Sequence, residues 1–386
     1  MATFEVSIET ITVFPHPNAD RLELARVGLY NIVVGKDSWV TGDKVLYIPE
    51  YAVLPESIIV ALGLEGKLAG SKGDRVKPVK LRGSLSQGLV APLSFLPEGA
   101  LEELGEDADF SEVLGITKWE PEVPMSMSGD VEGNYGLINW IDIENLKKFP
   151  DMFTEGEEVI VDEKIHGTAS LFTFINPKSE DADVLVSSKG LATRKLVLKE
   201  SEGNVYWNVL RDYKLRAFAA FVAAKVEGES DWTNDADGRV YELPTPIVEK
   251  VAVFGETFGS KVQDLHYGFK AGKLGFAVFD IFVEVTVNNE TKGFWLDPAF
   301  VEQLTTEGNV PLVPRLFTGP FSLEKVTELA TGKELVSGKS LHVREGVVVR
   351  PVRRNPDDAS HKIGKYVSDA YLTRKATDGI EPTEFN

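Results

Sequence analysis

The first third of the chain consists of short runs in which apolar and polar residues alternate, and each run ends at a turn signal. Glycine and proline separate the runs, which are FEVSIETITVF (4–14), RLELARVGLYNIVV (21–34), KVLYIPEYAVL (44–54) and KPVKLRGSLSQGLVAPL (77–93). A period of two at such short spacing is typical of antiparallel strands joined by tight turns. The pattern therefore predicts a small β-barrel and not a series of βαβ units.

The remaining two thirds predict an α+β domain. Its strand candidates are longer and more apolar, namely EEVIVDEKI, ASLFTFI, DVLVSSK, VAVFGETF, LGFAVFDIFVEV, GFWLD and REGVVVRPV. Residues 204–226 repeat apolar side chains at helical spacing and predict one amphipathic helix. DPAFVEQLTTEG and SLEKVTELATG predict shorter helices with Asp or Ser caps. Antiparallel sheets flanked by helices follow.

Composition narrows the cellular setting. The chain has 386 residues, 43% of them hydrophobic, so it is long enough for two or three packed domains. It has no cysteine, no leader-like start and no apolar run of membrane-spanning length. We therefore expect a cytoplasmic protein without a membrane partner. An acidic, proline-containing stretch from about residue 101 to 128 suggests domains at 1–115 and 139–386, joined by a connection at 116–138.

The charge restricts contact with nucleic acid to local patches. There are 60 acidic and 41 basic residues, a net charge of −19, so the whole surface does not attract a polyanion. One basic stretch stands out, with Lys67, Lys72, Arg75, Lys77, Lys80 and Arg82. A second lies between Arg350 and Lys365. From charge alone, solvated basic loops are an equally good interpretation.

One lysine stands where a predicted strand ends, in VDEKIHGTAS (161–170). Most such lysines are surface residues. The alternative is a nucleophile, which needs an uncharged amine and hence desolvation or nearby cations to lower its pKa. In that interpretation Gly167 allows the backbone to approach a ligand closely.

The residues downstream favour the nucleophile. In order come VSSKGLATRK (186–195), VAVFGETFG (251–259), GFAVFDIFV (275–283), REGVVVRP (344–351) and HKIGKYVSDAYL (361–372). Separately, these are ordinary strand residues and polar strand ends. Together they supply an amine, two carboxylates for ribose or metal, an aromatic face for a base and cations for phosphates.

This ordered set resembles the covalent nucleotidyltransferase superfamily of ligases and mRNA capping enzymes, whose hallmark is Lys-x-(Asp/His)-Gly. Lys164-Ile-His-Gly167 matches that motif, and His at its third position is similar to RNA ligases of the RNA ligase 2-like group. The resemblance covers nearly the whole chain. VFGETFGSKVQDLHYG, INWIDIENLKKFPDMF and LRGSLSQGLV look like the nick-sealing subgroup with an N-terminal OB module. The implied fold is an OB-type β-barrel followed by an ATP-grasp-like adenylation domain.

The resemblance also implies roles. Lys164 would attack the α-phosphate of ATP and hold AMP covalently. Glu256 would bind the ribose, Phe279 would stack on the adenine, and Glu345, with Asp280, would face a metal. The remaining nucleotide contacts would come from Glu163, Ile165, His166, Gly167, Lys189, Lys362 and Lys365. The last motif departs from the usual Lys-x-Lys, because this chain has Lys362-Ile-Gly-Lys365.

Cofactor and substrate follow from the same implication. Oxygen ligands and the absence of cysteine favour Mg²⁺ or Mn²⁺, and the five histidines lack zinc spacing. PHPNADRLELARVG is similar to OB modules that bind tRNA, so the basic stretch Lys67 to Arg82 would contact nucleic acid. The OB module could instead serve only as a docking platform.

The resulting interpretation is an ATP-dependent RNA ligase that seals 3′-hydroxyl/5′-phosphate nicks in duplex RNA or an RNA/DNA hybrid. No obligate protein partner is evident. Two alternatives remain open at this point: a capping-type guanylyltransferase that uses GTP, and a non-catalytic OB-fold RNA-binding protein.

Overall fold

The computed structural model describes residues 4–120, 123–228, 232–234, 240–242, 246–260, 262–354 and 362–374. It divides into two compact units. The first unit comprises Met1–Pro121, Asp142–Thr154 and Gly364–Arg374, and the second comprises Glu122–Ile141, Glu155–Ile363 and Lys375–Asn386. The chain therefore passes between the units more than once, whereas the predicted limits of 1–115, 116–138 and 139–386 divide it in sequence order. Those limits stay a prediction about domains.

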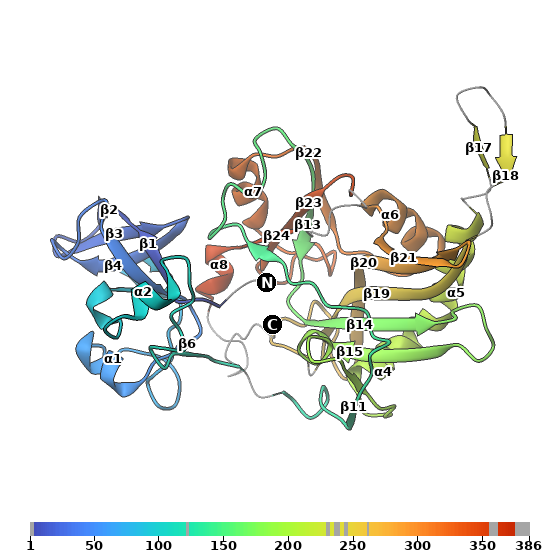
Figure 1. Ribbon diagram of the computed structural model, residues 1–386, viewed down its shortest axis with the longest axis horizontal. Coiled ribbons are helices and arrows are strands. Elements are labelled where there is room, and N and C mark those ends of the chain that lie inside the picture. Colours follow the sequence, from blue (N-terminus) through green and yellow to red (C-terminus); the bar gives the residue numbers. More distant parts are fainter. Residues whose placement is uncertain are drawn as a thin grey trace. The chain divides into compact units, whose positions relative to one another are not determined.

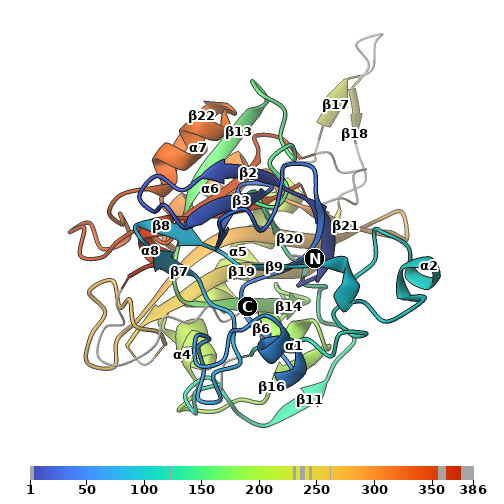
Figure 2. The ribbon, with the colours of Figure 1, turned by 90° about the vertical axis from the view of Figure 1, so that its left-hand side faces the viewer.

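The first unit begins with the predicted short strands. They form two three-stranded antiparallel sheets, one in the order β1 (Ser7–Thr10), β5 (Lys44–Ile48), β9 (Leu89–Ala91) and one in the order β2 (Thr12–Pro15), β3 (Leu22–Val27), β4 (Tyr30–Gly35). Figure 2 shows β2 and β3 side by side, paired from Thr12 opposite Arg26 onward. Alternate residues enter the core, as in β4, where Tyr30, Ile32 and Val34 are buried.

Smaller elements complete the first unit. They are β6 (Ala52–Val53) paired with β10 (Thr117–Lys118), the hairpin β7 (Val79–Leu81) and β8 (Ser84–Ser86), and the helices α1 (Glu56–Ala61), η1 (Leu93–Phe95) and α2 (Ala100–Leu104). Segments from later in the chain add β12 (Glu144–Asn145), parallel to β24 (Gly364–Val367), and α8 (Asp369–Leu372). Buried Lys147 joins these parts, because its Nζ lies 3.2 Å from Gln87 Oε1 and 2.7 Å from Asp369 Oδ1.

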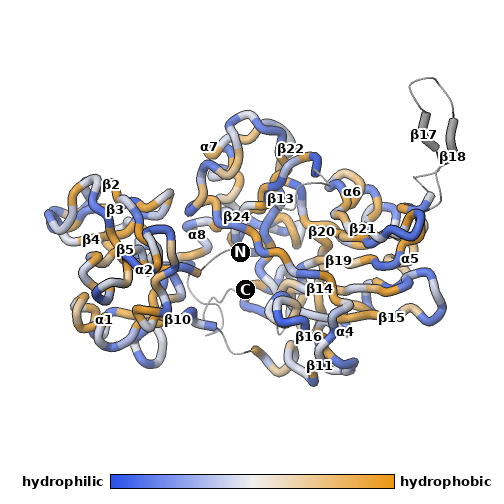
Figure 3. Tube along the Cα trace, in the orientation of Figure 1, coloured by the Kyte–Doolittle hydropathy of each residue, from blue (hydrophilic) through white to orange (hydrophobic). Residues whose placement is uncertain are grey.

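The second unit is organised by a five-stranded antiparallel sheet (Figure 1). Its order is β15 (Asp183–Ser188), β14 (Thr168–Ile175), β19 (Ile247–Gly259), β20 (Leu274–Val287) and β21 (Glu290–Trp295). One face packs on α4 (Val205–Asp212), α5 (Leu215–Gly228) and α6 (Pro298–Glu307). Figure 3 shows hydrophobic residues along these strands. The other face carries a smaller cluster that includes Leu171, Phe254 and Phe279. It is the face left for a site.

The single long helix predicted for residues 204–226 is wrong in one respect, because the structure has two helices there. Asn204 caps α4 by accepting from Tyr206 N and Trp207 N, and the chain then turns at Lys214, which has φ +51°. A left-handed residue ends a helix, so apolar spacing alone does not reveal the break. The helix α6 forms as predicted, as does α7 (Leu323–Ala330), whose cap Ser322 accepts from Lys325 N.

A second group of strands in this unit centres on β13 (Glu158–Lys164), which pairs antiparallel with β22 (Arg315–Pro320) on one side and β23 (Gly346–Pro351) on the other. The remaining elements are β11 (Val131–Gly133) paired with β16 (Leu196–Leu198), α3 (Lys189–Ala192), and β17 (Trp232–Asn234) paired with β18 (Val240–Glu242). Within the described residues, no helix has both the length and the apolar character needed to cross a membrane.

Candidate functional site

Strand register brings Lys164 and Glu345 together. Lys164 is the last residue of β13 and pairs with Gly346, the first residue of β23. Glu345 therefore lies immediately before β23 begins, next to Lys164. Lys164 Nζ is 2.5 Å from Glu345 Oε1. The glutamate side chain is fully buried, whereas 21% of the lysine side chain is exposed. The amine therefore lies against a buried carboxylate at the end of a partly exposed side chain.

The turn after Lys164 is held by buried polar contacts. His166 Nε2 lies 2.7 Å from Asp264 Oδ1, and the backbone N–H of His166 donates to Tyr267 Oη at 2.8 Å. Gln263 Nε2 donates to the carbonyl of Gly167 at 2.6 Å. Burial and the Glu345 carboxylate raise the pKa of Tyr267 well above its ordinary value, so this phenol keeps its proton. His166 thus fixes the loop that follows the amine.

Gly167 is required for a close approach to the neighbouring strand β19. A Cβ there would stand 2.2 Å from the carbonyl oxygen of Thr257 and 3.0 Å from Glu256 Oε1. Any larger residue would push β19 and its glutamate away from the turn. The glycine therefore sets the distance between the Lys164 loop and Glu256.

Glu256 lies near Lys164 and Glu345. It pairs with Ala169 in the sheet and lies on the same face as Phe254, away from the helices. The pKa of Glu256 is raised to about 8: burial is the main cause, the Lys164 charge opposes the rise, and the Glu345 charge adds to it. Lys189, the first residue of α3, acts on the same carboxyl. Four predicted residues, Lys164, Lys189, Glu256 and Glu345, therefore lie close enough to affect one another's charge.

Glu163 points away from that group. Its side chain is buried, its Oε2 accepts from Leu335 N at 2.9 Å, and Arg344 Nε lies 3.5 Å from the same oxygen. Burial raises its pKa to about 7. The backbone N–H of Glu163 donates to Pro314, and Ile165 is buried. Glu163 thus holds the segment before Glu345 in place through its side chain.

Phe279 lies in a β-bulge of β20. Phe254 pairs with Asp280 and Gly255 pairs with Val278, so Phe279 has no partner residue on β19. A bulge redirects the side chain of the extra residue. The Phe279 ring is half-buried and meets Trp140 edge to face, with ring centroids 6.4 Å apart. This arrangement leaves an aromatic ring on the same face of the sheet as Glu256.

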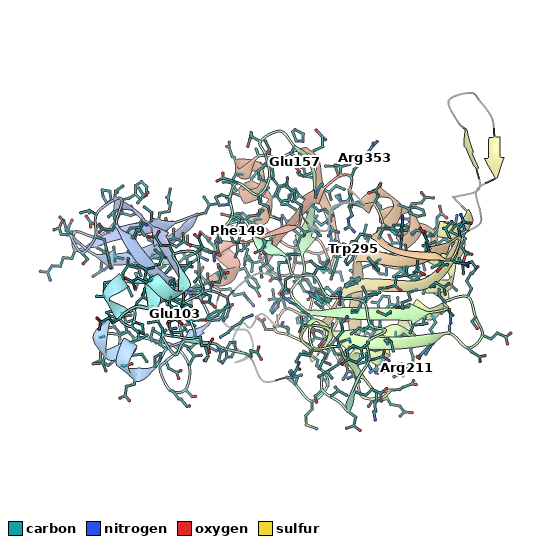
Figure 4. The ribbon with its side chains drawn as sticks, viewed as in Figure 1. Glu103, Phe149, Glu157, Arg211, Trp295 and Arg353 are labelled. Atoms are coloured by element: carbon teal, nitrogen blue, oxygen red, sulfur yellow. The ribbon has the colours of Figure 1, made fainter. Side chains whose placement is uncertain are left out.

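The predicted metal role of Asp280 does not fit its surroundings. Its Oδ2 is 2.5 Å from Arg354 Nη2 and 3.5 Å from Arg350 Nη1, and its Oδ1 accepts from Ile281 N. Two guanidinium groups already balance this carboxylate. Figure 4 labels Trp295, whose ring lies 5.4 Å below the guanidinium of Arg354. Asp280 is thus an anchor for the bulge.

The two lysines predicted for the last motif are placed differently. Lys362 Nζ binds both oxygens of Glu157, at 2.6 and 2.8 Å. Glu157, labelled in Figure 4, immediately precedes β13, whereas Lys164 ends that strand. The structure therefore does not bring Lys362 to Lys164, because a strand of seven residues separates them. Lys365 is buried on β24 of the first unit, opposite Asn145.

The basic stretch predicted to contact nucleic acid lies in the first unit. Five of its cations are exposed, namely Lys67, Lys72, Lys77, Lys80 and Arg82. Arg75 is buried, and its guanidinium stacks 4.0 Å above the ring of Trp119. Arg75 is therefore a packing residue, and the other five carry accessible charge.

Residues that the sequence analysis did not assign complete the site: Asp264, Gln263, Tyr267, Trp140, Arg344 and Arg350. Three of them stand in KVQDLHYG, a stretch singled out without roles for its members. His166 was the available signal in the sequence, because a buried histidine N–H needs an acceptor, here Asp264.

Glu345 offers one oxygen to a divalent cation, although the described residues contain no cluster of three or more His, Cys, Asp or Glu side chains suited to a metal. Its Oε2 is buried and has no hydrogen-bond partner among the residues that the structure describes. An unsatisfied buried carboxylate oxygen is costly unless a cation or a donor reaches it. Carboxylate oxygens are the ligands that Mg²⁺ and Mn²⁺ prefer.

Two family models match parts of the chain. A family model described as RNA ligase matches residues 157–367, and a model of an OB-fold domain matches residues 5–93. No curated protein sequence matches the chain.

Solved structures of a Naegleria gruberi RNA ligase are similar over 96% of this chain. A mutant with ATP and Mn has 23% identity and a TM-score of 0.72 over 98% of its own chain. The form with PPi has 23% identity and a TM-score of 0.71, also over 98%. Another mutant, with AMP and Mn, has 22% identity and a TM-score of 0.71 over 98%. At this identity the likeness establishes the shared fold.

Proposed function

This chain belongs to the RNA ligase family, and we propose that it joins RNA ends through an ATP-dependent mechanism in which Lys164 carries AMP. The observation that carries the proposal is the amine of Lys164, partly exposed, 2.5 Å from a buried carboxylate of Glu345. A similar fold with ATP, AMP and PPi in the Naegleria gruberi structures supports ATP as the substrate.

The first step is the transfer of AMP to the enzyme. Lys164 Nζ attacks the α-phosphorus of ATP, a P–N bond forms, and the P–O bond to pyrophosphate breaks. The amine must lose a proton for this attack, and Glu345 Oε1 is the acceptor within hydrogen-bond reach. AMP then passes to a 5′-phosphate, and a 3′-hydroxyl displaces it to form the phosphodiester.

The same face of the large sheet would hold the nucleoside. In its ionised form Glu256 would accept hydrogen bonds from the ribose hydroxyls. Its pKa of about 8 means that most of this carboxyl carries a proton at neutral pH. Phe279 would stack on the adenine, since aromatic rings pair well with bases. Lys189 acts on Glu256 and would place its charge near ribose or phosphate.

Glu345 would hold a divalent metal through Oε2. A metal bound there supplies Lewis acidity toward the phosphate oxygens. The role of Asp280 in such a site is not proposed, because its carboxylate pairs with arginines.

For the nucleic acid we propose a nick in duplex RNA or an RNA/DNA hybrid, with RNA on the 3′-hydroxyl side. The exposed cations of the first unit support contact with a phosphate backbone, whereas the nick and the RNA strand are proposed from the family resemblance. These cations are Lys67, Lys72, Lys77, Lys80 and Arg82.

The first test is formation of the covalent adduct. Intact-protein mass spectrometry after incubation with ATP and Mn²⁺ should show the addition of one adenylyl group, and Lys164→Arg should show none. Incubation with GTP serves as the control. An adduct with GTP alone would indicate a guanylyltransferase, and no adduct with either nucleotide would favour a non-catalytic RNA-binding protein.

The second test concerns the nucleic acid. Gel assays with nicked duplexes, which differ only in RNA or DNA at the 3′-hydroxyl strand, should show sealing of the RNA form. The variant Lys77→Glu/Lys80→Glu should lose nick sealing yet retain the adenylyl adduct. Equal sealing by that variant and the unaltered protein at several salt concentrations would remove the first unit's basic stretch from the substrate contacts.

A further inference from the structure

Arg350 is a buried cation that no part of the proposed chemistry uses. It stands in β23 with 4% of its surface exposed. Its Nη1 donates to the backbone carbonyl of Phe279 at 2.7 Å and lies 3.5 Å from Asp280 Oδ2. Burial of a guanidinium is unfavourable unless it is paired and hydrogen-bonded. The question is what this residue accomplishes at that position.

On its other side Arg350 reaches the strand that carries the nucleophile. Its Nε is 3.4 Å from Oδ2 of Asp162, whose side chain is 3% exposed, and this contact is an ion pair without a hydrogen bond. Asp162 precedes Lys164 by two residues, so both side chains project from the same face of β13. Arg350 pairs with Ile160, which places it diagonally across from Asp162 on that face.

The carbonyl that Arg350 binds is an unusual one. It belongs to the extra residue of the β20 bulge, where the ladder to β19 is interrupted between Phe254 and Gly255. A carbonyl at such an interruption needs a donor from outside the ladder. Arg350 supplies that donor, and so determines where the backbone of Phe279 lies.

A guanidinium suits this position better than an ammonium. Its planar fork can direct one nitrogen to the Phe279 carbonyl and another to Asp162, while a lysine amine is a single point charge. Asp280 also pairs with a second arginine, since Arg354 Nη2 lies 2.5 Å from Asp280 Oδ2. Among the described residues Arg354 pairs with Asp280 and makes no hydrogen bond to Phe279, so it provides a matched control.

We propose that Arg350 is a positioning residue for the nucleobase: it braces the Phe279 bulge against the strand that bears Lys164, and so sets the adenine platform relative to the nucleophile. The inference rests on the proposed function, in which Phe279 stacks on adenine. Arg350 acts through Phe279 and touches no substrate atom.

The test is a double-mutant cycle on adenylyl transfer. The rate of adduct formation is measured against ATP concentration for the unaltered protein, Arg350→Lys, Phe279→Ala and the double variant, with Arg354→Lys as control. We expect Arg350→Lys to raise the KM for ATP about tenfold, which is the scale of one aromatic contact, while kcat changes less than about threefold. In the Phe279→Ala background, the same change should alter KM less than about twofold.

Other results would overturn the brace. They are an equal KM effect of Arg350→Lys with and without Phe279, a loss of kcat without a KM change, or an Arg354→Lys variant with the same KM defect. If Arg350→Lys does not fold, Arg350→Gln/Asp162→Asn removes the cation together with the carboxylate that it faces on β13 and leaves the Asp280–Arg354 pair intact. That variant should show the same rise in KM, and an unchanged KM counts against the proposal.

A failure of the proposed function is distinguishable from a failure of the brace. If Lys164 does not carry AMP, the unaltered protein forms no adduct and the cycle gives no rates. If only the brace is wrong, the adduct forms normally and Arg350→Lys behaves like Arg354→Lys.

Discussion

β13 has a lysine–glutamate pair near each of its ends, and the two pairs share their chemistry but not their surroundings. At the start of the strand Lys362 meets Glu157, with 32% and 25% of the side chains exposed. At its end Lys164 meets Glu345, whose side chain is fully buried. Water screens the first pair, whereas the second acts on Glu256 and Tyr267 nearby. Burial and neighbours, and not the pair itself, distinguish a candidate nucleophile from a surface contact.

The largest difference between the two ends should come from removing each lysine. Lys164→Ala should lower adenylyl-adduct formation by at least about 10³-fold, because the variant lacks the amine that forms the P–N bond. Lys362→Ala should leave adduct formation within about twofold. Adduct yield by mass spectrometry compares them, and equal losses would end the distinction drawn here.

Removing the glutamates should give the next largest difference. Glu345→Gln keeps the shape of the side chain but removes its charge, and we expect adduct formation to fall about 10²-fold. Glu157→Gln should have little effect on the rate. Single-turnover kinetics over a range of Mn²⁺ concentrations measures both variants. A Glu345→Gln enzyme with the normal rate and metal dependence contradicts the role of this carboxylate.

A pH series sharpens the comparison at the Lys164 end. Burial raises the pKa of Glu256 from 4.5 to about 8, so between these values the folded protein binds more protons than the unfolded chain. The free energy of unfolding therefore contains a contribution that falls as pH rises through this window. Glu256→Gln removes it and should gain stability relative to the unaltered protein, by about 1 kcal/mol or more between about pH 5 and pH 8.

Urea unfolding at several pH values measures that effect. The difference in unfolding free energy should grow with pH and level off above about pH 8. A difference that does not depend on pH shows that Glu256 titrates normally.

The smallest effect is expected for the stability contribution of the exposed pair. Lys362→Ala should lower the free energy of unfolding by about 0–1 kcal/mol, and added salt should reduce the loss. Denaturant unfolding at low and high salt tests this. A loss of several kcal/mol would show that the start of β13 is as tightly organised as its end.

Local pattern was enough to predict much of the fold. Alternation and turn residues predicted the strands of the first third, because these signals act within a few residues. The helix α7 has the predicted Ser322 cap, whereas Asp297 precedes α6 without a side-chain cap hydrogen bond. The break between α4 and α5 was missed, since a left-handed turn at Lys214 leaves the apolar spacing intact. Sequence order also predicted 139–386 as one block, although 142–154 and 364–374 pack within the first unit.

For the site, the sequence by itself determined which side chains are available: an amine before His-Gly, glutamates at strand ends, a Phe-Asp pair and several cations. Only the tertiary structure decided which of them meet. Strand register brings Glu345 to Lys164. A bulge in β20 leaves Phe279 without a partner residue on β19, whereas the next residue, Asp280, pairs with two arginines. The physical reason is that charge interactions depend on distance and burial, and both are set by strands far apart in the chain.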